Sequence, residues 1–303
     1  MSIYQVIVLA IVQGLAELLP VSSSAHVVVA EKLMGLDPST PQMTLLLVML
    51  HTGTMFAVIA YFWNQWKQSY FATADAFKRF ALRLIYATAL TGIVGEALIK
   101  LVEHTMFKGA PKAEIEDLFG RLDLVAPALA CAGLLILISG LREKKEEAEA
   151  ANVASITRRP LDSVTMRQAG WMGLLQGLAL PFRGFSRSGV TISAGMLTGA
   201  AKERAERFSF ALAVVITPAA IAREAMRLMH SLHSPAVGTM PGALGEVPGV
   251  LGISLLGAVF AFLAGLVALK WLSSWLENGR WYLFGIYCLV ASAVVFYLHT
   301  RGY

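Results

Sequence analysis

The chain has 303 residues, of which 56% are hydrophobic and 15% are charged, and its mean hydropathy is +0.63. These values exclude an ordinary soluble protein and indicate a membrane protein without a separate soluble domain. The formal net charge of +5 suits lipid headgroups, but no basic stripe interleaved with aromatic residues indicates a nucleic-acid partner. Cys131 and Cys288 lie inside apolar runs and predict neither a disulfide nor a metal site.

The chain begins with two short apolar runs, 3–19 and 25–33, which are separated by Pro20. We expect no removable signal peptide, because no basic region precedes the first run and no small-residue cleavage site follows it. A helix, a polar break and a second short helix are typical of a segment that dips partway into the bilayer. Its non-helical backbone must then be buried in protein or face water.

Longer apolar runs, each long enough to cross a hydrocarbon core of roughly 30 Å, follow this pair. A second interrupted pair, 168–180 and 190–201, surrounds Pro181. The predicted fold is all-α and polytopic, with one membrane domain over 1–303. It has two re-entrant pairs and six transmembrane helices, at 42–63, 84–103, 124–141, 208–230, 250–270 and 281–298.

Basic residues predict the orientation of these helices. The 64–83 connection holds four Lys or Arg and the 142–167 connection holds six, whereas 231–249 holds none, so the first two are expected on the cytoplasmic side. The 104–123 connection then falls on the opposite side. The mixed charges at 142–150 are typical of a solvated helix end.

The two halves of the chain resemble each other. Gln-Gly-Leu-Ala precedes a proline break at 13–16 and again at 176–179, and three spans follow each break. An odd number of spans reverses the second half, which predicts an inverted-topology repeat. Repeat one covers about 1–141, a cytoplasmic loop 142–167, and repeat two about 168–303.

The first break carries groups that could do chemistry. Gln13 and Glu17 share one helix face, and a carboxylate in an apolar setting is costly unless it is partnered or used. Ser22 is a natural N-cap for the next helix, so the amides of Ser23, Ser24 and Ala25 are expected to face an anion. His26 follows Ser23 by three residues, which places it within expected reach of that hydroxyl.

The second break holds two arginines, Arg183 and Arg187. An arginine deep in a membrane protein needs an anionic partner, and phosphate suits the guanidinium fork. Alternatively, one of the two arginines does not bind phosphate and either faces cytoplasmic water or forms an ion pair with Glu17. We expect this role for Arg183 rather than for Arg187. Gly184 and Gly189 are expected to let the backbone approach the phosphate closely. Further hydrogen-bond donors are expected from Ser186, Ser188 and Thr191. His51 and Thr52 are expected to be local hydrogen-bonding groups outside the catalytic set.

The two breaks together closely resemble the undecaprenyl-diphosphate phosphatase family, also called bacitracin-resistance proteins. The resemblance rests on Gln-Gly-Leu-Ala-Glu-Leu-Leu-Pro-Val-Ser-Ser-Ser-Ala-His at 13–26 and Arg-Gly-Phe-Ser-Arg-Ser-Gly-Val-Thr at 183–191, and it covers nearly the full length. Two local differences are present. Arg183 precedes Gly184 where many members have proline, with one apparent extra residue after Pro181, and Ser24-Ala25 replaces Thr-Gly.

The resemblance implies a membrane hydrolase that converts undecaprenyl diphosphate to the monophosphate carrier used in peptidoglycan synthesis and so gives bacitracin resistance. It places Glu17, Ser23, His26 and Arg187 at catalytic positions, and Gln13 where the family accepts Glu or Gln. It also implies the bacterial inner membrane, a site that opens to the periplasm, and a divalent cation, Mg²⁺ or Ca²⁺. Glu17 and Gln13 are the candidate cation ligands, and a homodimer is a further candidate assembly.

Two questions stay open in the sequence. The nucleophile could be Ser23, His26 or water, with Arg187 and a helix N-terminus stabilising the transferred phosphoryl group. The competing class is a transporter or flippase of phosphorylated polyprenyl lipid, because inverted repeats with broken helices are usual in secondary transporters. Ser23 and His26 favour the enzyme, since a transporter needs no nucleophile and proton acceptor.

Overall fold

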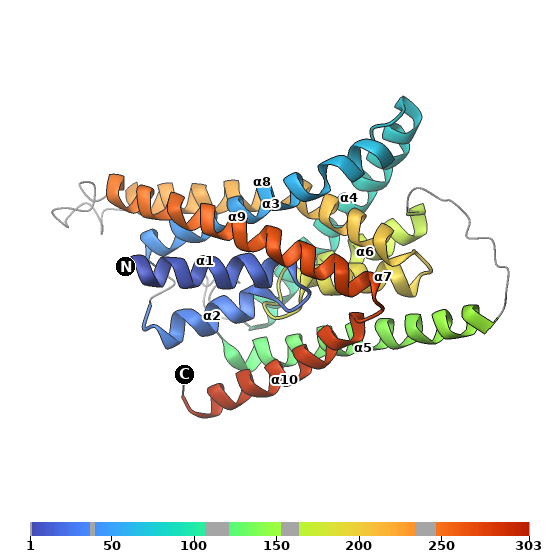
Figure 1. Cartoon of the computed structure of the whole chain (residues 1–303). Helices are drawn as coiled ribbons and strands as arrows, with labels where there is room; N and C mark the ends of the chain where they lie inside the picture. The colour runs from blue at the N-terminus through green and yellow to red at the C-terminus, as the bar shows by residue number, and fades with distance from the viewer. Residues whose placement is uncertain (1, 37–39, 107–120, 153–163, 234–246, 303) are drawn as a thin grey trace.

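The computed structural model describes residues 2–36, 40–106, 121–152, 164–233 and 247–302, and these residues form ten helices and no strand (Figure 1). The helices are α1 (Ile3–Leu18), α2 (Ser23–Leu33), α3 (Pro41–Ser69), α4 (Ala74–Met106), α5 (Leu122–Asn152), α6 (Met166–Ala179), α7 (Arg187–Leu197), α8 (Lys202–His233), α9 (Val247–Glu277) and α10 (Trp281–Thr300). The predicted fold class, all-α, is confirmed for the described residues.

Five of these helices, α3, α4, α5, α9 and α10, are long and apolar enough to cross a membrane. They contain five of the six predicted spans, and the protein is therefore a multi-pass helical membrane protein. The sixth predicted span, 208–230, lies inside α8, which is not among these five as far as its described residues show. Helix α5 continues through the predicted solvated end, 142–150, and exposed side chains are confirmed for its first turn, where Arg142 pairs with Glu146 at 2.8 Å.

The two helix–break–helix pairs have the same local design. Ser2 and Gln5 form a capping box at the start of α1, and Thr165 and Gln168 form one at the start of α6. Helices α2 and α7 both have 11 residues and both follow a serine at the N-cap position. Each is also followed, two residues after its last residue, by a glycine with positive φ, Gly35 at 66° and Gly199 at 88°.

Each first helix of a pair packs against a long helix from the other half of the chain. Helix α1 packs on α9, and α6 packs on α4. The contact is close because a glycine faces the partner backbone. A Cβ on Gly14 would lie 2.7 Å from the Ala261 carbonyl oxygen, and one on Gly177 would lie 2.9 Å from the Thr91 carbonyl oxygen.

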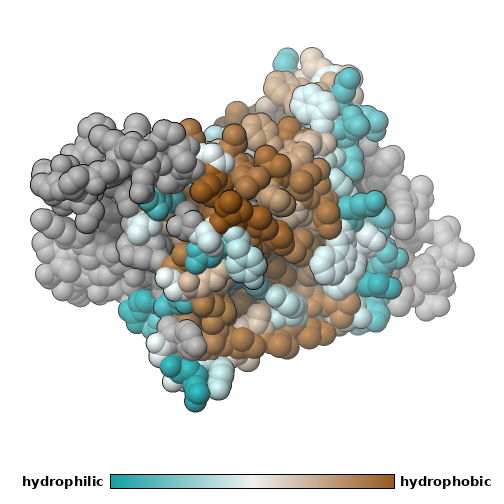
Figure 2. All heavy atoms as spheres, turned by 60° about the vertical axis from the view of Figure 1, so that its left-hand side comes forward, coloured by the Kyte–Doolittle hydropathy of each residue, from teal (hydrophilic) through white to brown (hydrophobic). Residues whose placement is uncertain are grey.

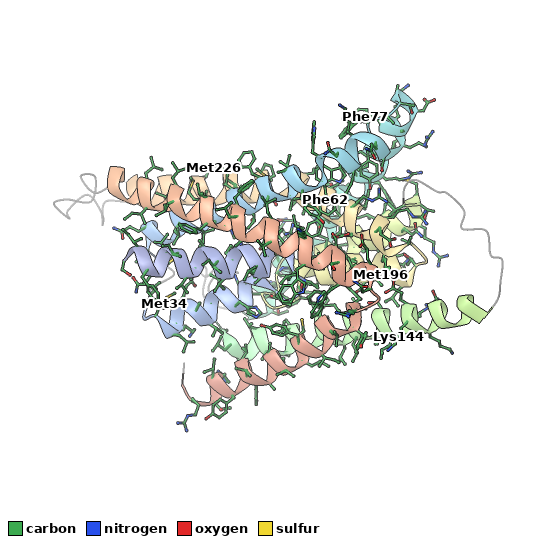
Figure 3. All side chains as sticks on the ribbon, in the orientation of Figure 1. Met34, Phe62, Phe77, Lys144, Met196 and Met226 are labelled. Atoms are coloured by element: carbon green, nitrogen blue, oxygen red, sulfur yellow. The ribbon has the colours of Figure 1, made fainter. Side chains whose placement is uncertain are left out.

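The two pairs enter the bundle from opposite ends (Figure 1). Helix α1 runs inward from one end and α2 returns to it, whereas α6 and α7 do the same from the other end. In Figure 3, Met34 after α2 lies to the left of the centre of the bundle, whereas Met196 in α7 lies to the right of it. The two breaks, 19–22 and 180–186, therefore meet in the middle of the bundle.

The interior is filled by aromatic and aliphatic side chains, while the exterior is also largely apolar. Phe62 is 1% exposed and stacks between Trp66 and Phe210. Outward-facing residues such as Ile85 and Val290 are 68% and 60% exposed. Figure 2 shows a broad apolar area on one face, with hydrophilic residues gathered toward its margins. Such a surface suits lipid rather than water.

Candidate active site

The two breaks are joined by hydrogen bonds between them. The Ser24 hydroxyl accepts a hydrogen bond from the Gly184 amide at 3.2 Å, and the Ser188 hydroxyl donates to the Leu19 carbonyl at 3.3 Å. Gly184 has a φ of 97°, and a Cβ there would lie 2.4 Å from the Val125 carbonyl oxygen of α5. Only glycine fits this conformation and this space without strain.

Glu17, at the end of α1, is the centre of the cluster that results. One of its carboxylate oxygens forms an ion pair with Arg187, the first residue of α7. Its other oxygen accepts hydrogen bonds from the Ser23 hydroxyl at 2.5 Å and from the Gln13 amide at 3.2 Å. The Glu17 and Arg187 side chains are 14% and 24% exposed, so the pair is largely shielded from solvent.

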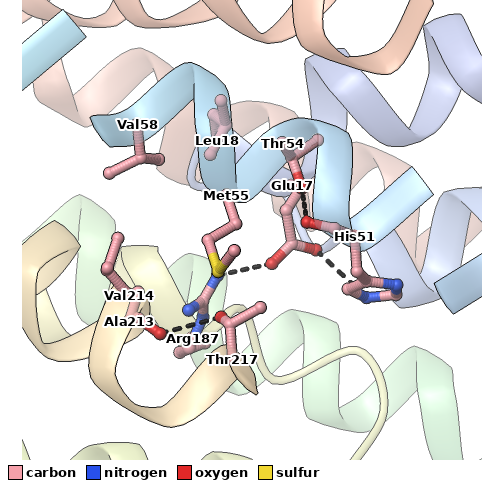
Figure 4. Close-up of a pocket in the computed structure, with 10 residues that line it drawn as sticks. All are labelled: Glu17, Leu18, His51, Thr54, Met55, Val58, Arg187, Ala213, Val214 and Thr217. Atoms are coloured by element: carbon pink, nitrogen blue, oxygen red, sulfur yellow. Dashed lines mark hydrogen bonds and ion pairs between the residues drawn. The ribbon is translucent and has the colours of Figure 1, made fainter. Parts of the chain in front are cut away.

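A pocket lies beside this ion pair, between α1, α3, α7 and α8 (Figure 4). Its polar wall consists of Glu17, Arg187, His51, Thr54 and Thr217. The remaining wall is apolar and consists of Leu18, Met55, Val58, Ala213 and Val214. The pocket therefore combines a charged end with a hydrophobic lining.

His51 belongs to this site, although the sequence analysis left it out of the catalytic set. Its Nε2 atom lies 3.9 Å from a Glu17 carboxylate oxygen, and its Nδ1 atom hydrogen-bonds the Leu47 carbonyl at 2.8 Å. The sequence feature that could have identified His51 as a site residue was its position inside an apolar span, 42–63. Thr52 is confirmed as a local group, since its hydroxyl donates to the Val48 carbonyl at 2.8 Å.

His26 has different partners from those expected. Its Nδ1 atom lies 2.8 Å from the Ser22 carbonyl oxygen, and its Nε2 atom lies 2.7 Å from the Tyr287 hydroxyl of α10. The expected partner, the Ser23 hydroxyl, instead donates to Glu17. The difference arises because Glu17 and Tyr287 come from other helices, which spacing along α2 cannot reveal.

Ser22 occupies the predicted N-cap position of α2, but its side chain makes no capping hydrogen bond. Its hydroxyl is 3.2 Å from that of Ser24. With a φ of 68°, Ser22 is the single non-glycine residue of positive φ among those the structure describes. A serine in this region is strained, and such strain tends to occur at functional sites.

The hydroxyls predicted around the second break bond within the protein. Ser186 caps α7 by accepting from the Gly189 amide at 3.3 Å, and Thr191 bonds the Arg187 carbonyl at 2.8 Å and the Ser209 hydroxyl at 2.5 Å. These bonds stabilise the first turn of α7, which carries Arg187, and join it to α8. Of the two alternatives expected for Arg183, cytoplasmic water or a pair with Glu17, the second was wrong: Arg187 forms that pair, because the first residue of α7 projects toward α1.

The described part of the chain contains no group of three or more His, Cys, Asp or Glu side chains that could hold a metal ion alone. Glu17 and Gln13, the two candidate cation ligands, are adjacent. Cys131 and Cys288 are free thiols, in agreement with the sequence analysis.

This fold and site define a multi-pass, all-helical membrane protein with a shielded carboxylate–arginine pair between two helix breaks. Residues 6–294 match the family model of bacitracin resistance protein BacA, and the chain belongs to this family. It is 52% identical to undecaprenyl-diphosphatase 2 of Acinetobacter baylyi over 97% of both chains. It is also 33% identical to undecaprenyl-diphosphatase 2 of Burkholderia thailandensis over 96% of this chain and 95% of that protein.

Proposed function

We propose that this protein hydrolyses undecaprenyl diphosphate to undecaprenyl phosphate and inorganic phosphate, which recycles the lipid carrier of peptidoglycan synthesis and gives bacitracin resistance. The observation that carries the proposal is the arrangement of Arg187, Glu17 and Ser23: a cation, a base and a hydroxyl in one shielded cluster. The names of the relatives, undecaprenyl-diphosphatases, support the same reaction.

The residues that line the pocket suit an amphipathic phosphorylated lipid, and the space between them, about 10 Å³, would have to widen to admit it. The charged end of the pocket, with Arg187, would bind the diphosphate, and its apolar wall on α3 and α8 would contact the first isoprene units. Ser23 and Arg187 are the first residues of α2 and α7. Both helix N-termini therefore add partial positive charge where the transferred phosphoryl group would lie.

The reaction would begin with an exchange of partners. Glu17 neutralises Arg187 in the structure. A bound phosphate would take over the guanidinium and leave Glu17 free to accept a proton. The Ser23 oxygen attacks the terminal phosphorus while its proton passes to Glu17, and the bond to the bridging oxygen breaks with its electrons on undecaprenyl phosphate. Water then hydrolyses the phosphoserine. Direct attack by water and attack by His26 are the alternative first steps.

A divalent cation, Mg²⁺ or Ca²⁺, is part of this proposal. Magnesium is commonly held by one or two carboxylates together with substrate phosphates and water. The Gln13 amide nitrogen donates to Glu17 in the structure, so its amide group would turn over to place its oxygen beside the carboxylate as a second protein ligand. When bound, the cation would neutralise charge on the diphosphate.

The membrane arrangement is the inverted repeat of the sequence analysis, with six transmembrane helices and two re-entrant pairs in the bacterial inner membrane. The matching capping boxes and the exchanged packing of α1 on α9 and α6 on α4 support it. The end of the bundle that contains the 70–73 and 278–280 turns would face the cytoplasm. The site would open to the periplasm, and a homodimer would form through the exposed apolar faces.

The test is phosphate release from undecaprenyl diphosphate by purified protein in detergent, with and without a chelator. We expect release by the wild type, loss of at least about 100-fold in Ser23→Ala and Glu17→Gln, and little change in Arg183→Ala. Rapid quenching should trap phosphate on Ser23. No release under any cation, together with movement of the lipid between leaflets, would favour a flippase instead.

A further inference from the structure

Both ring nitrogens of His26 are engaged, and their partners define the protonation of the ring. The Ser22 carbonyl oxygen can only accept a hydrogen bond, so the Nδ1 atom, 2.8 Å away, carries a proton. In the neutral imidazole the Nε2 atom is then an acceptor. The Tyr287 hydroxyl, 2.7 Å from Nε2, must therefore donate to it.

Tyr287 holds this position from the other half of the chain. Its ring lies nearly parallel to the His26 imidazole, with 5.7 Å between ring centroids and 12° between the planes. The next residue of α10, Cys288, donates from its thiol to the Pro20 carbonyl at 3.3 Å. Helix α10 thus supports the first break on both sides of Ser22. Tyr287 is 47% exposed, so filling the interior does not account for its phenol.

We propose that Tyr287 is a positioning residue for the reaction. With the Ser22 carbonyl it fixes the imidazole of His26 in one orientation and in the tautomer that carries its proton on Nδ1. This role rests on the proposed hydrolysis and on the participation of His26 in it.

Tyr287→Phe tests the role of the hydroxyl alone, because the phenylalanine ring preserves the stacking on His26. We expect kcat for phosphate release to fall about tenfold, the usual effect of one hydrogen bond to a reacting group, with KM changed less than about twofold. Tyr297→Phe is the matched control on the same helix, since Tyr297 is 59% exposed, and it should retain wild-type kcat.

Two readouts separate positioning from a structural role. In protein labelled with ¹⁵N-histidine, the Nε2 resonance of His26, identified by its loss in His26→Ala, should shift in Tyr287→Phe and not in Tyr297→Phe. In the double variant with His26→Ala, Tyr287→Phe should cause no further loss of kcat. The same tenfold loss in both backgrounds, or an unchanged His26 resonance, would overturn the proposal. An inactive wild type would instead count against the proposed hydrolysis.

Discussion

At the scale of single residues, the sequence identified most members of the site but not their partners. The sequence identified Glu17, Ser23 and Arg187 as candidate site residues. Charged groups in apolar surroundings are costly unless they have a partner or a function, and the Ser23 hydroxyl lies beside a proline break. That Glu17 binds both of the others could not be derived, because Arg187 lies in the other half of the chain.

Glu17→Gln should expose the charge of Arg187. Removing one partner of a shielded ion pair leaves the other uncompensated, which we expect to lower the free energy of unfolding by about 1–3 kcal/mol at this partial exposure. Added inorganic pyrophosphate should raise the thermal unfolding midpoint of Glu17→Gln more than that of the wild type. Equal shifts in both proteins would show that Arg187 does not bind the anion.

His51 provides a second residue-scale prediction. Because its Nε2 atom lies beside the Glu17 carboxylate in the pocket, His51→Ala should lower kcat/KM about tenfold. Thr52→Val is the matched control, since Thr52 bonds only its own helix backbone and should retain full activity. Steady-state phosphate release measures both variants. Equal activity in the two would remove His51 from the site.

At the scale of helices, local sequence predicted the breaks well and their edges less well. Pro20 and Pro181 end helical runs as expected, but α2 begins at Ser23 and α7 at Arg187, two and three residues earlier than the predicted 25 and 190. Ser22 is the expected N-cap of α2, and Ser186 takes the same position before α7, so Ser23 and Arg187 are first-turn residues. This shift aims both side chains at the site.

The close packing of α1 on α9, which come from different halves of the chain, leads to a prediction about helix stability. Gly14→Ala would place a Cβ 2.6 Å from the Ala264 Cβ atom and should destabilise the α1–α9 contact by about 1–3 kcal/mol. Gly92→Ala, on α4 with no atom within 4 Å of its added Cβ, should be neutral or slightly stabilising. Thermal unfolding in detergent compares the two. A stable Gly14→Ala protein would contradict the close packing.

At the scale of the whole molecule, the site belongs to both halves. The first break supplies Glu17 and Ser23, the second supplies Arg187, and each break is supported by a long helix of the opposite half: α10 contacts Pro20, and α5 contacts Gly184. Neither half alone would therefore contain a complete site.

The proposed inverted arrangement predicts which end of the bundle faces which compartment. In a Cys131→Ala, Cys288→Ser background, Gly302→Cys should react with a membrane-impermeant maleimide in intact spheroplasts, because the end of α10 lies at the opposite end of the bundle from the 70–73 turn (Figure 1). Ala72→Cys, in the turn between α3 and α4, should react only after permeabilisation. Labelling of both from outside would rule out the proposed topology.

The sequence by itself determined the membrane class, the positions of the breaks and the residue types of the site, because these depend on hydropathy, proline and local repeats. Only the tertiary structure decided that Arg187 rather than Arg183 neutralises Glu17, that His51 joins the pocket and that His26 bonds to Tyr287. These pairings depend on how distant helices pack. Packing is a property of the whole chain, which spacing within one segment does not encode.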